Sequence, residues 1–267
     1  MREVRSSEEE RLSVNWRGGR CQSRVVLRVE DWVRCLAFDL ESDLLAVGTY
    51  GGAVIVAQLA SGETVTTLEG LGSEVTALAF DSERILAGGI DGSVALWRRE
   101  GGRGAAWAGG LLGQLAGPCT GVHLGSDSAA AVSSVRGQVK VWGAGGAADC
   151  STHEIGRAIS CCAVGAGYAF AGLRDGRVLV FRPDGPGGLF DRSDVEPTPI
   201  LSFIASFTEI AAITVAPASD SAGGGLLYAG AADGIIKRHG ASPSCVPRSS
   251  LSLPCTHACA PLFQLGH

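Results

Sequence analysis

The stretch GGIDGSVALW (88–97) carries a pattern that the chain repeats four more times. In it a run of small residues leads to a turn with glycine in second place, and an alternating apolar strand follows. An aromatic residue, Trp97, stands six positions after the turn residue Asp91. The matching stretches are VGTYGGAVIVA (47–57), SSVRGQVKVW (133–142), GLRDGRVLVF (172–181) and GAADGIIKRH (230–239).

The turn glycines give the repeat its period. They are Gly52, Gly92, Gly137, Gly176 and Gly234. Successive members lie 40, 45, 39 and 58 residues apart, and the first three steps match the ~40–45 residues of a propeller blade. Asp-Gly turns, here at Asp91, Asp175 and Asp233, predict two-residue primed hairpin turns. Glycine suits them because its backbone readily takes positive φ.

An apolar strand precedes each of these hairpins, and an outer strand follows most of them, most clearly in ETVTTLE (63–69) and ILSFIAS (200–206). A single sheet of this kind cannot bury both of its faces, so the units must stack around an axis. The sequence therefore predicts an all-β propeller with five recognisable blades. Their cores are expected near 33–57, 75–97, 119–142, 159–181 and 210–239.

Through DGSVALW, RGQVKVW, DGRVLVF and DGIIKRH the chain resembles the WD-repeat β-propeller family, over about residues 24–250. The Trp-Asp pair of that family is not intact, because Trp97 is followed by Arg98 and Trp142 by Gly143. The resemblance implies a hydrogen-bond tetrad that uses a histidine, the turn aspartate and the tryptophan, and no repeat completes it. We therefore expect packed apolar strands to supply most of the stability.

The repeats divide the chain into an N-terminal arm (1–22), a propeller (23–254) and a tail or the start of a truncated blade (255–267). Most members of the resembling family close with seven blades, whereas five are visible here. The segment SRVVLRVE (23–30) would pair with the last blade in a closed ring. Either the chain is truncated, or the ring closes with fewer blades, or a partner covers the open edge; we favour truncation.

Composition excludes several classes of protein. With 46% apolar and 18% charged residues among 267, the chain is unlike disordered sequences. A net charge of −5 supplies no basic field for nucleic acid. The uncharged stretch 44–62 is interrupted by Gly48, Gly51 and Gly52, so two strands around a turn describe it better than a transmembrane segment. Nine cysteines without a disulfide framework and an N-terminus without a signal-peptide core predict a reducing compartment, the cytoplasm or nucleus.

No catalytic constellation stands out, and we predict a protein that is not an enzyme and binds no cofactor. The histidines have no patterned nucleophile beside them, and neither a G-x-S-x-G elbow nor a phosphate loop is present. Cys255, His257 and Cys259, with Cys245 upstream, have irregular spacing for zinc, so no metal site is predicted. In the apolar pair Cys161–Cys162 one side chain is expected to pack inward as a small hydrophobe.

Candidate ligand-binding residues lie at the turns, which share one face of a propeller. Arg174 precedes Asp175 and resembles the Arg-Asp turn with which F-box/WD-repeat ubiquitin-ligase receptors contact phosphorylated degrons. Arg136 and Arg157 lie nearby in the pattern, and guanidinium groups read phosphate or carboxylate bidentately. The simpler interpretation is that these arginines are surface charges that keep the protein in solution. Tyr50 and Ile90 take the place of Arg174 in other repeats and favour an apolar peptide site.

A second similarity to F-box/WD-repeat receptors lies in RLSVNWRGGRC (11–21), which is similar to the junction between their F-box and propeller. It implies that Trp16 packs under the propeller as an anchor, whereas an ordinary aromatic contact of a terminal arm is the simpler interpretation. The F-box itself is not in this sequence. Binding of a Skp-type adaptor is therefore expected only if an F-box is missing from it.

Taken together, the residues predict a non-catalytic interaction scaffold that binds a protein or peptide, phosphorylated or acidic in the narrower version, on the turn-bearing face. That narrower version makes the chain the substrate-recognition part of an F-box/WD-repeat ubiquitin-ligase subunit. The alternative is a propeller that binds phosphoinositides at a membrane surface. The paired arginines of that family resemble Arg98–Arg99, but Glu100 follows them in place of glycine.

Overall fold

The computed structural model describes residues 25–99, 101, 105–193, 195–217 and 225–241. Within them the chain forms five antiparallel sheets, each a meander whose strands pair in chain order. We number these sheets blades 1 to 5. Blade 1 comprises β1 (Val33–Asp39), β2 (Leu44–Thr49), β3 (Val54–Gln58) and β4 (Thr64–Leu68); blade 2, β5 (Val75–Phe80), β6 (Arg84–Gly89), β7 (Ser93–Arg99) and β8 (Trp107–Gln114); blade 3, β9 (Cys119–Leu124), β10 (Ala129–Ser133), β11 (Gln138–Trp142) and β12 (Cys150–Glu154); blade 4, β13 (Ile159–Gly165), β14 (Tyr168–Leu173), β15 (Arg177–Phe181) and β16 (Leu201–Ile204); blade 5, β17 (Ile210–Pro217), β18 (Gly225–Ala231) and β19 (Ile236–Ala241).

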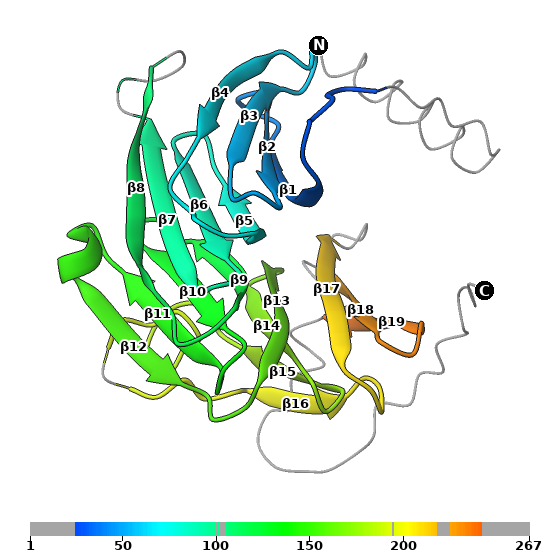
Figure 1. Cartoon of the computed structure of the whole chain (residues 1–267). Coiled ribbons are helices and arrows are strands. Elements are labelled where there is room, and N and C mark those ends of the chain that lie inside the picture. The colour runs from blue at the N-terminus through cyan, green and yellow to red at the C-terminus, as the bar shows by residue number, and fades with distance from the viewer. Residues whose placement is uncertain (1–24, 100, 102–104, 194, 218–224, 242–267) are drawn as a thin grey trace, which may run out of the picture.

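The blades fan around a common axis with the first strand of each blade innermost (Figure 1). These inner strands contact one another in sequence, β1 with β5, β5 with β9, β9 with β13 and β13 with β17. The only helical element among the described residues is a 3-10 turn at Gly146–Ala148. The prediction of an all-β propeller with five blades is thus confirmed. No helix in the described part of the chain is long and apolar enough to cross a membrane.

Apolar side chains fill the space between neighbouring blades. Between blades 1 and 2, for example, Val54 and Val56 pack against Ile85 and Trp97, all of them buried. The aromatic residue of each repeat faces the preceding blade: Trp97 joins the core shared with blade 1, Trp142 the core shared with blade 2 and Phe181 the core shared with blade 3. Since each buried large apolar side chain stabilises a fold by about 1.5–3 kcal/mol, these interfaces supply most of the stability.

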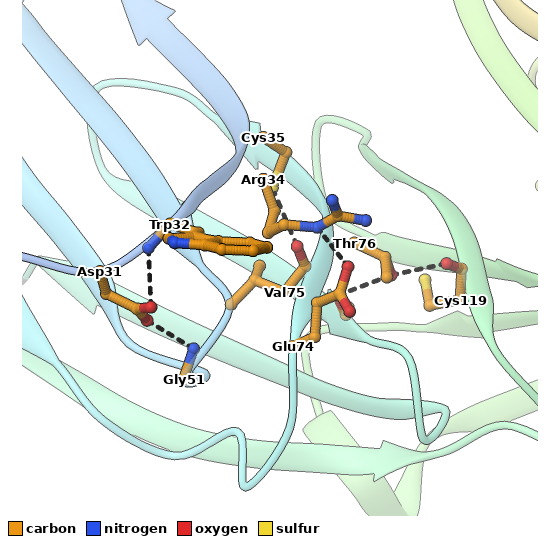
Figure 2. A network of polar contacts seen from close by, with 10 residues as sticks. Asp31, Trp32, Arg34, Cys35, Gly51, Glu74, Val75, Thr76 and Cys119 are labelled. Carbon is orange, nitrogen blue, oxygen red and sulfur yellow. Dashed lines mark hydrogen bonds and ion pairs between the residues drawn. The ribbon is translucent and has the colours of Figure 1, made fainter.

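Short hydrogen bonds connect the inner strands of neighbouring blades. At the bulge of β5, the Thr76 hydroxyl donates to the carbonyl of Cys119 on β9 at 2.7 Å and to that of Gly88 at 3.1 Å. The equivalent Ser160 on β13 donates to Ile210 on β17 at 2.6 Å. At the same position blade 1 carries Arg34, which is ion-paired with Glu74 of blade 2 (Figure 2). The residue at this strand position therefore connects three pairs of neighbouring blades. A hydroxyl hydrogen bond connects blades 2 and 3 and blades 4 and 5, and an ion pair connects blades 1 and 2.

The two ends of the array differ from its interior. On β1, Leu36 and Phe38 are 60% and 61% exposed, whereas the equivalent Leu78 and Phe80 of blade 2 pack against the core shared with blade 1. Among the described residues, no comparable contact joins β17 to β1. Residues 25–30 form no strand, so the expected pairing of 23–30 with the last blade is not present there. No described strand therefore covers the apolar surface that Leu36 and Phe38 expose on blade 1.

The two-residue primed turn predicted from Asp-Gly is wrong for all three Asp-Gly hairpins, and the Gly51-Gly52 hairpin of blade 1 does not have it either. At Gly52, Gly92, Gly176 and Gly234, the glycine is the fourth residue of the turn, and its N–H donates to the carbonyl three residues earlier. In these four, the φ of glycine is +80° to +92°, and the residue before it, Gly51 in blade 1 and an aspartate in the other three, is not among the positive-φ residues. A three-residue connection with left-handed glycine results. Only the turn of blade 3 is primed, with φ +55° at Arg136 and +62° at Gly137.

Candidate functional site

One face of the propeller gathers the five hairpin turns and the loops that precede the inner strands; we call it the turn face. In each blade a backbone N–H of the turn donates to the carbonyl of the residue just before or at the start of the inner strand, as in Tyr50 to Trp32 and Ile90 to Glu74, both at 2.9 Å. In blades 1 to 4 the turn also lies against the loop that enters the next blade: a Cβ atom added at Gly176, for example, would meet the Ser206 carbonyl at 2.1 Å. The turn face is therefore a fixed surface.

The turn aspartates hold the backbone beyond them. Asp91 accepts the backbone N–H of Ser93 at 2.9 Å, Asp175 that of Arg177 at 3.1 Å and Asp233 that of Ile235 at 3.0 Å. Burial alone would raise the pKa of Asp91, but hydrogen bonds from Ser93 and Ser73 outweigh it and hold the pKa below its usual value. For Asp233 the hydrogen bond from Ile235 contributes most to lowering the pKa. Both carboxylates thus stay ionised in their structural role.

The three predicted arginines lie exposed on the turn face of blades 3 and 4, and each faces a different carboxylate. Arg136 pairs with Glu154 at 3.5 Å, Arg157 with Asp175 at 3.3 Å and Arg174 with Glu209 at 3.8 Å. A phosphate would have to compete with these acidic partners. Exposed pairs of this kind are weak, typically about 0–1 kcal/mol each, so the arginines remain able to change partner.

Aromatic and apolar side chains occupy the turn face as well. The predicted Tyr50 and Ile90 are exposed there, and so are Trp32, Val135, Phe207 and Ile235. Trp32 and Phe207, which are 75% and 93% exposed, were missed by sequence reasoning. Trp32 stands directly before the first inner strand, where an apolar residue reads as part of that strand, so nothing in the pattern marked it as exposed.

Trp32 and Tyr50 form a corner of this surface that hydrogen bonds to Asp31 hold in place. Their ring centroids lie 6.1 Å apart with the planes tilted by 56°. The Asp31 carboxylate accepts the backbone N–H of Trp32 at 2.7 Å and that of Gly51 at 2.6 Å (Figure 2). These two bonds, the one from Gly51 first, lower the pKa of Asp31. An ionised carboxylate thus fixes the backbone that carries both rings.

Four thiols on the inner strands are buried or half-buried, and their pKa values are raised. Burial raises the pKa of Cys35 and of Cys161 to about 11, and that of Cys119 and of Cys162 to about 12. Protonated thiols are poor nucleophiles and metal ligands. Cys161 and Cys162 each pack against a core between blades. Within the described residues no cluster of three or more His, Cys, Asp or Glu side chains could hold a metal ion.

Two other predictions concern different places. Arg99, of the Arg98–Arg99 pair, donates to the Ser82 carbonyl at 2.6 Å and lies 5.2 Å from the Trp107 ring centroid, at the end of β7 away from the turn face. Its guanidinium is already engaged. The predicted anchor Trp16 and the Cys255–Cys259 segment lie outside the described residues.

Comparisons with known proteins agree with this architecture. Residues 62–98, which run from the end of the β3–β4 connection to β7, match the family described as WD domain, G-beta repeat. The solved beta-propeller domain of Cps50 (Swd1) from Myceliophteria thermophila is similar with a TM-score of 0.59 and 17% identity, covering 77% of this chain and 64% of that one. The computationally designed Ika8 protein is similar with a TM-score of 0.52 and 22% identity, covering 77% of this chain and 57% of that one. No curated protein matches the sequence.

The fold and these matches define a β-propeller. More particularly, it is a propeller that contains a WD repeat, and the predicted resemblance to WD-repeat propellers is confirmed, whereas the closer resemblance to F-box/WD-repeat receptors is not shown. The chain spans less than two thirds of the length of either solved chain. At these identities the structural likeness concerns the fold alone.

Proposed function

We propose that this chain is a non-catalytic interaction scaffold that binds a peptide or protein on its turn face. One observation carries the proposal: exposed aromatic and apolar side chains lie at or next to the turns of four of the five blades, at Tyr50, Ile90, Val135 and Ile235. Exposed apolar side chains that gather on one surface mark interaction sites. The turns that carry them are hydrogen-bonded to the inner strands, so little ordering entropy opposes binding.

The narrower version of this function and the alternative to it rest on fewer observations. As the substrate-recognition part of an F-box/WD-repeat ubiquitin ligase, the chain would use Arg174, Arg136 and Arg157 to bind a phosphorylated or acidic peptide, and a Skp-type adaptor would need an F-box. Each of these three arginines is already paired with a carboxylate, which disfavours a preformed phosphate-binding pocket. A phosphoinositide-binding role gains nothing from Arg99, which is engaged with Ser82 and Trp107. A reducing compartment suits the free thiols among the described cysteines.

The test is selection of binders from a random peptide library, followed by measurement of their affinity for three variants. Ile90→Asp and Val135→Asp place charges on the turn face. Leu111→Asp is the control, because Leu111 is also an exposed apolar residue, at 64% against 45% for Ile90, but lies on the outer strand β8. We expect the first two variants to weaken binding at least tenfold and the control to leave it unchanged. Equal affinity for all three variants would refute the proposal. Arg174→Ala, tested with phosphorylated peptides, separates the narrower version from the broad one.

A further inference from the structure

The Trp32–Tyr50 corner has a chemistry of its own within the turn face. The two residues belong to different parts of blade 1, and the hydrogen bond from the Tyr50 N–H to the Trp32 carbonyl holds them together. Both rings are largely exposed, and their tilt of 56° at a centroid separation of 6.1 Å leaves π faces open to a ligand. Exposed tryptophan lowers solubility unless it serves a function. We therefore interpret an exposed aromatic pair on a fixed backbone as a ligand-binding feature.

The charges around the corner select the sign of that ligand. Asp31, the neighbour of Trp32, keeps its negative charge because backbone N–H groups of Gly51 and Trp32 hydrogen-bond to it. On the other side of Trp32 in the chain, Arg34 is neutralised by Glu74, whose side chain is only 11% exposed (Figure 2). Glu30 and Asp31 also line an open hollow of about 330 Å³, together with Arg28 and Gly51. The local field therefore repels anions.

Aromatic faces and a carboxylate attract the same kind of group. A cation within about 6 Å of a ring centroid gains about 0.5–1 kcal/mol at an exposed site, with tryptophan the best partner. A carboxylate adds an ion pair and hydrogen bonds to a lysine ammonium or an arginine guanidinium. A phosphate or an acidic peptide would gain neither. Purely apolar side chains would use the rings but leave the charge of Asp31 without a role in binding.

We propose that Trp32, Tyr50 and Asp31 form a recognition site for the positively charged end of a lysine or arginine side chain in a bound peptide. The inference rests on the proposed function, since it names the ligand chemistry of one part of the turn face. It also places the basic group of the ligand at blade 1, away from the arginines of blades 3 and 4. A peptide lying across the turn face would then carry its positive and negative groups toward opposite sides.

The test uses the full chain and four pentapeptides, Ac-Gly-Ser-X-Ser-Gly-NH₂, in which X is lysine, arginine, N-trimethyl-lysine or the neutral norleucine. The readout is the NMR signal of the Trp32 indole N–H, which Trp32→Phe assigns by its loss. We expect the three cationic peptides to shift this signal and the norleucine peptide to bind about two- to fivefold more weakly, the ratio that one exposed cation–π contact supplies. Raising the salt concentration should weaken the binding of the lysine and arginine peptides, because salt screens their attraction to the Asp31 carboxylate.

Substitutions inside and outside the proposed site test whether peptide binding depends on Trp32, Tyr50 and Asp31 or on the surrounding surface. Isothermal titration calorimetry measures the variants, because Trp32→Ala removes the NMR signal itself. Trp32→Ala and Tyr50→Ala should each weaken binding of the cationic peptides about two- to fivefold. Phe207→Ala, which removes an exposed aromatic side chain of the loop before blade 5, should leave their binding unchanged. Asp31→Asn should remove most of the salt dependence. Equal binding of norleucine, or stronger binding of a phosphoserine peptide at Trp32, would overturn the inference. If library peptides bind the turn face but leave the Trp32 signal unmoved, the inference fails while the proposed function stands.

Discussion

Blades 4 and 5 contain almost the same turn, Arg-Asp-Gly in one and Ala-Asp-Gly in the other, yet their surroundings differ. In blade 4 the strand after the turn is buried from Val178 to Phe181. In blade 5 the equivalent Ile236 is 52% exposed. Blade 4 has a neighbour on both sides, whereas the structure describes a neighbour of blade 5 on one side only. Local sequence thus sets the hairpin, and the adjacent blades decide what the hairpin buries.

The largest expected effect concerns the aromatic position of each repeat. Phe181 is fully buried in the core between blades 3 and 4, so Phe181→Ala should cost about 3–5 kcal/mol of unfolding free energy. His239, its counterpart in blade 5, is half-buried and lies 4.7 Å from the Phe203 ring centroid, and His239→Ala should cost about 1 kcal/mol. Urea denaturation measures both. Similar losses would mean that blade 5 is as tightly packed as blade 4.

The turn glycines offer the next contrast. An alanine Cβ at Gly176 would meet the Ser206 carbonyl at 2.1 Å, whereas at Gly234 nothing among the described residues lies within 4 Å. Both glycines have φ near +80°. Gly234→Ala should therefore cost only the left-handed backbone strain, about 1–2 kcal/mol, and Gly176→Ala clearly more, about 3 kcal/mol or above. Equal melting temperatures of the two variants would disprove this account of the turn.

A smaller effect distinguishes the hydroxyls between inner strands. The Thr76 hydroxyl bridges blades 2 and 3, while the hydroxyl of Thr120 donates only within its own blade, to Val132 at 3.3 Å. Thr76→Val should cost about 1–2 kcal/mol, because it leaves a carbonyl without its donor, and Thr120→Val less than about 1 kcal/mol. Differential scanning calorimetry is the measurement. The reverse order would remove the bridging role from Thr76.

The smallest effect is a pH dependence at Asp91. Its pKa in the folded state lies below the ordinary value of 3.8, because hydrogen bonds from Ser93 and Ser73 outweigh burial. Its contribution is therefore complete above about pH 4 and is lost as the pH falls through the folded-state pKa. The stability gap between the wild type and Asp91→Asn should narrow when the pH is lowered from 6 to 3. A constant gap would show that ionisation of Asp91 does not matter.

Much of the fold could be read from the sequence, because alternation and turn glycines are local signals. All five inner strands begin at the first residue of the predicted apolar runs, from Val33 to Ile210. The outer strands β8 and β12 were not recognised: WAGGLLGQ is rich in glycine and CSTHE is polar, so neither shows clear alternation. The turn type was predicted wrongly because Asp-Gly fits both a two-residue primed turn and a three-residue connection that ends in a left-handed glycine.

The candidate site was harder to predict from the sequence than the fold, since it depends on which side chains the folded chain leaves exposed. Tyr50 and Ile90 could be placed on the turn face from their register alone. The role of Trp32 depends on its contact with Tyr50 and on the two backbone bonds that Asp31 accepts, and no periodic pattern encodes these. The ion pairs of Arg136, Arg157 and Arg174 join residues up to 35 positions apart, so sequence reasoning could not tell that each arginine already has a carboxylate beside it.

The order of contacts among the inner strands has a consequence for how the molecule folds and opens. Each blade is a local meander that touches its neighbours in sequence, so folding can nucleate in any blade and spread along the chain in both directions. Opening then starts where a blade has one neighbour. Amide hydrogens of β18 and β19 should exchange with solvent well before those of β10 and β14, and the protein should lose its structure blade by blade from its ends.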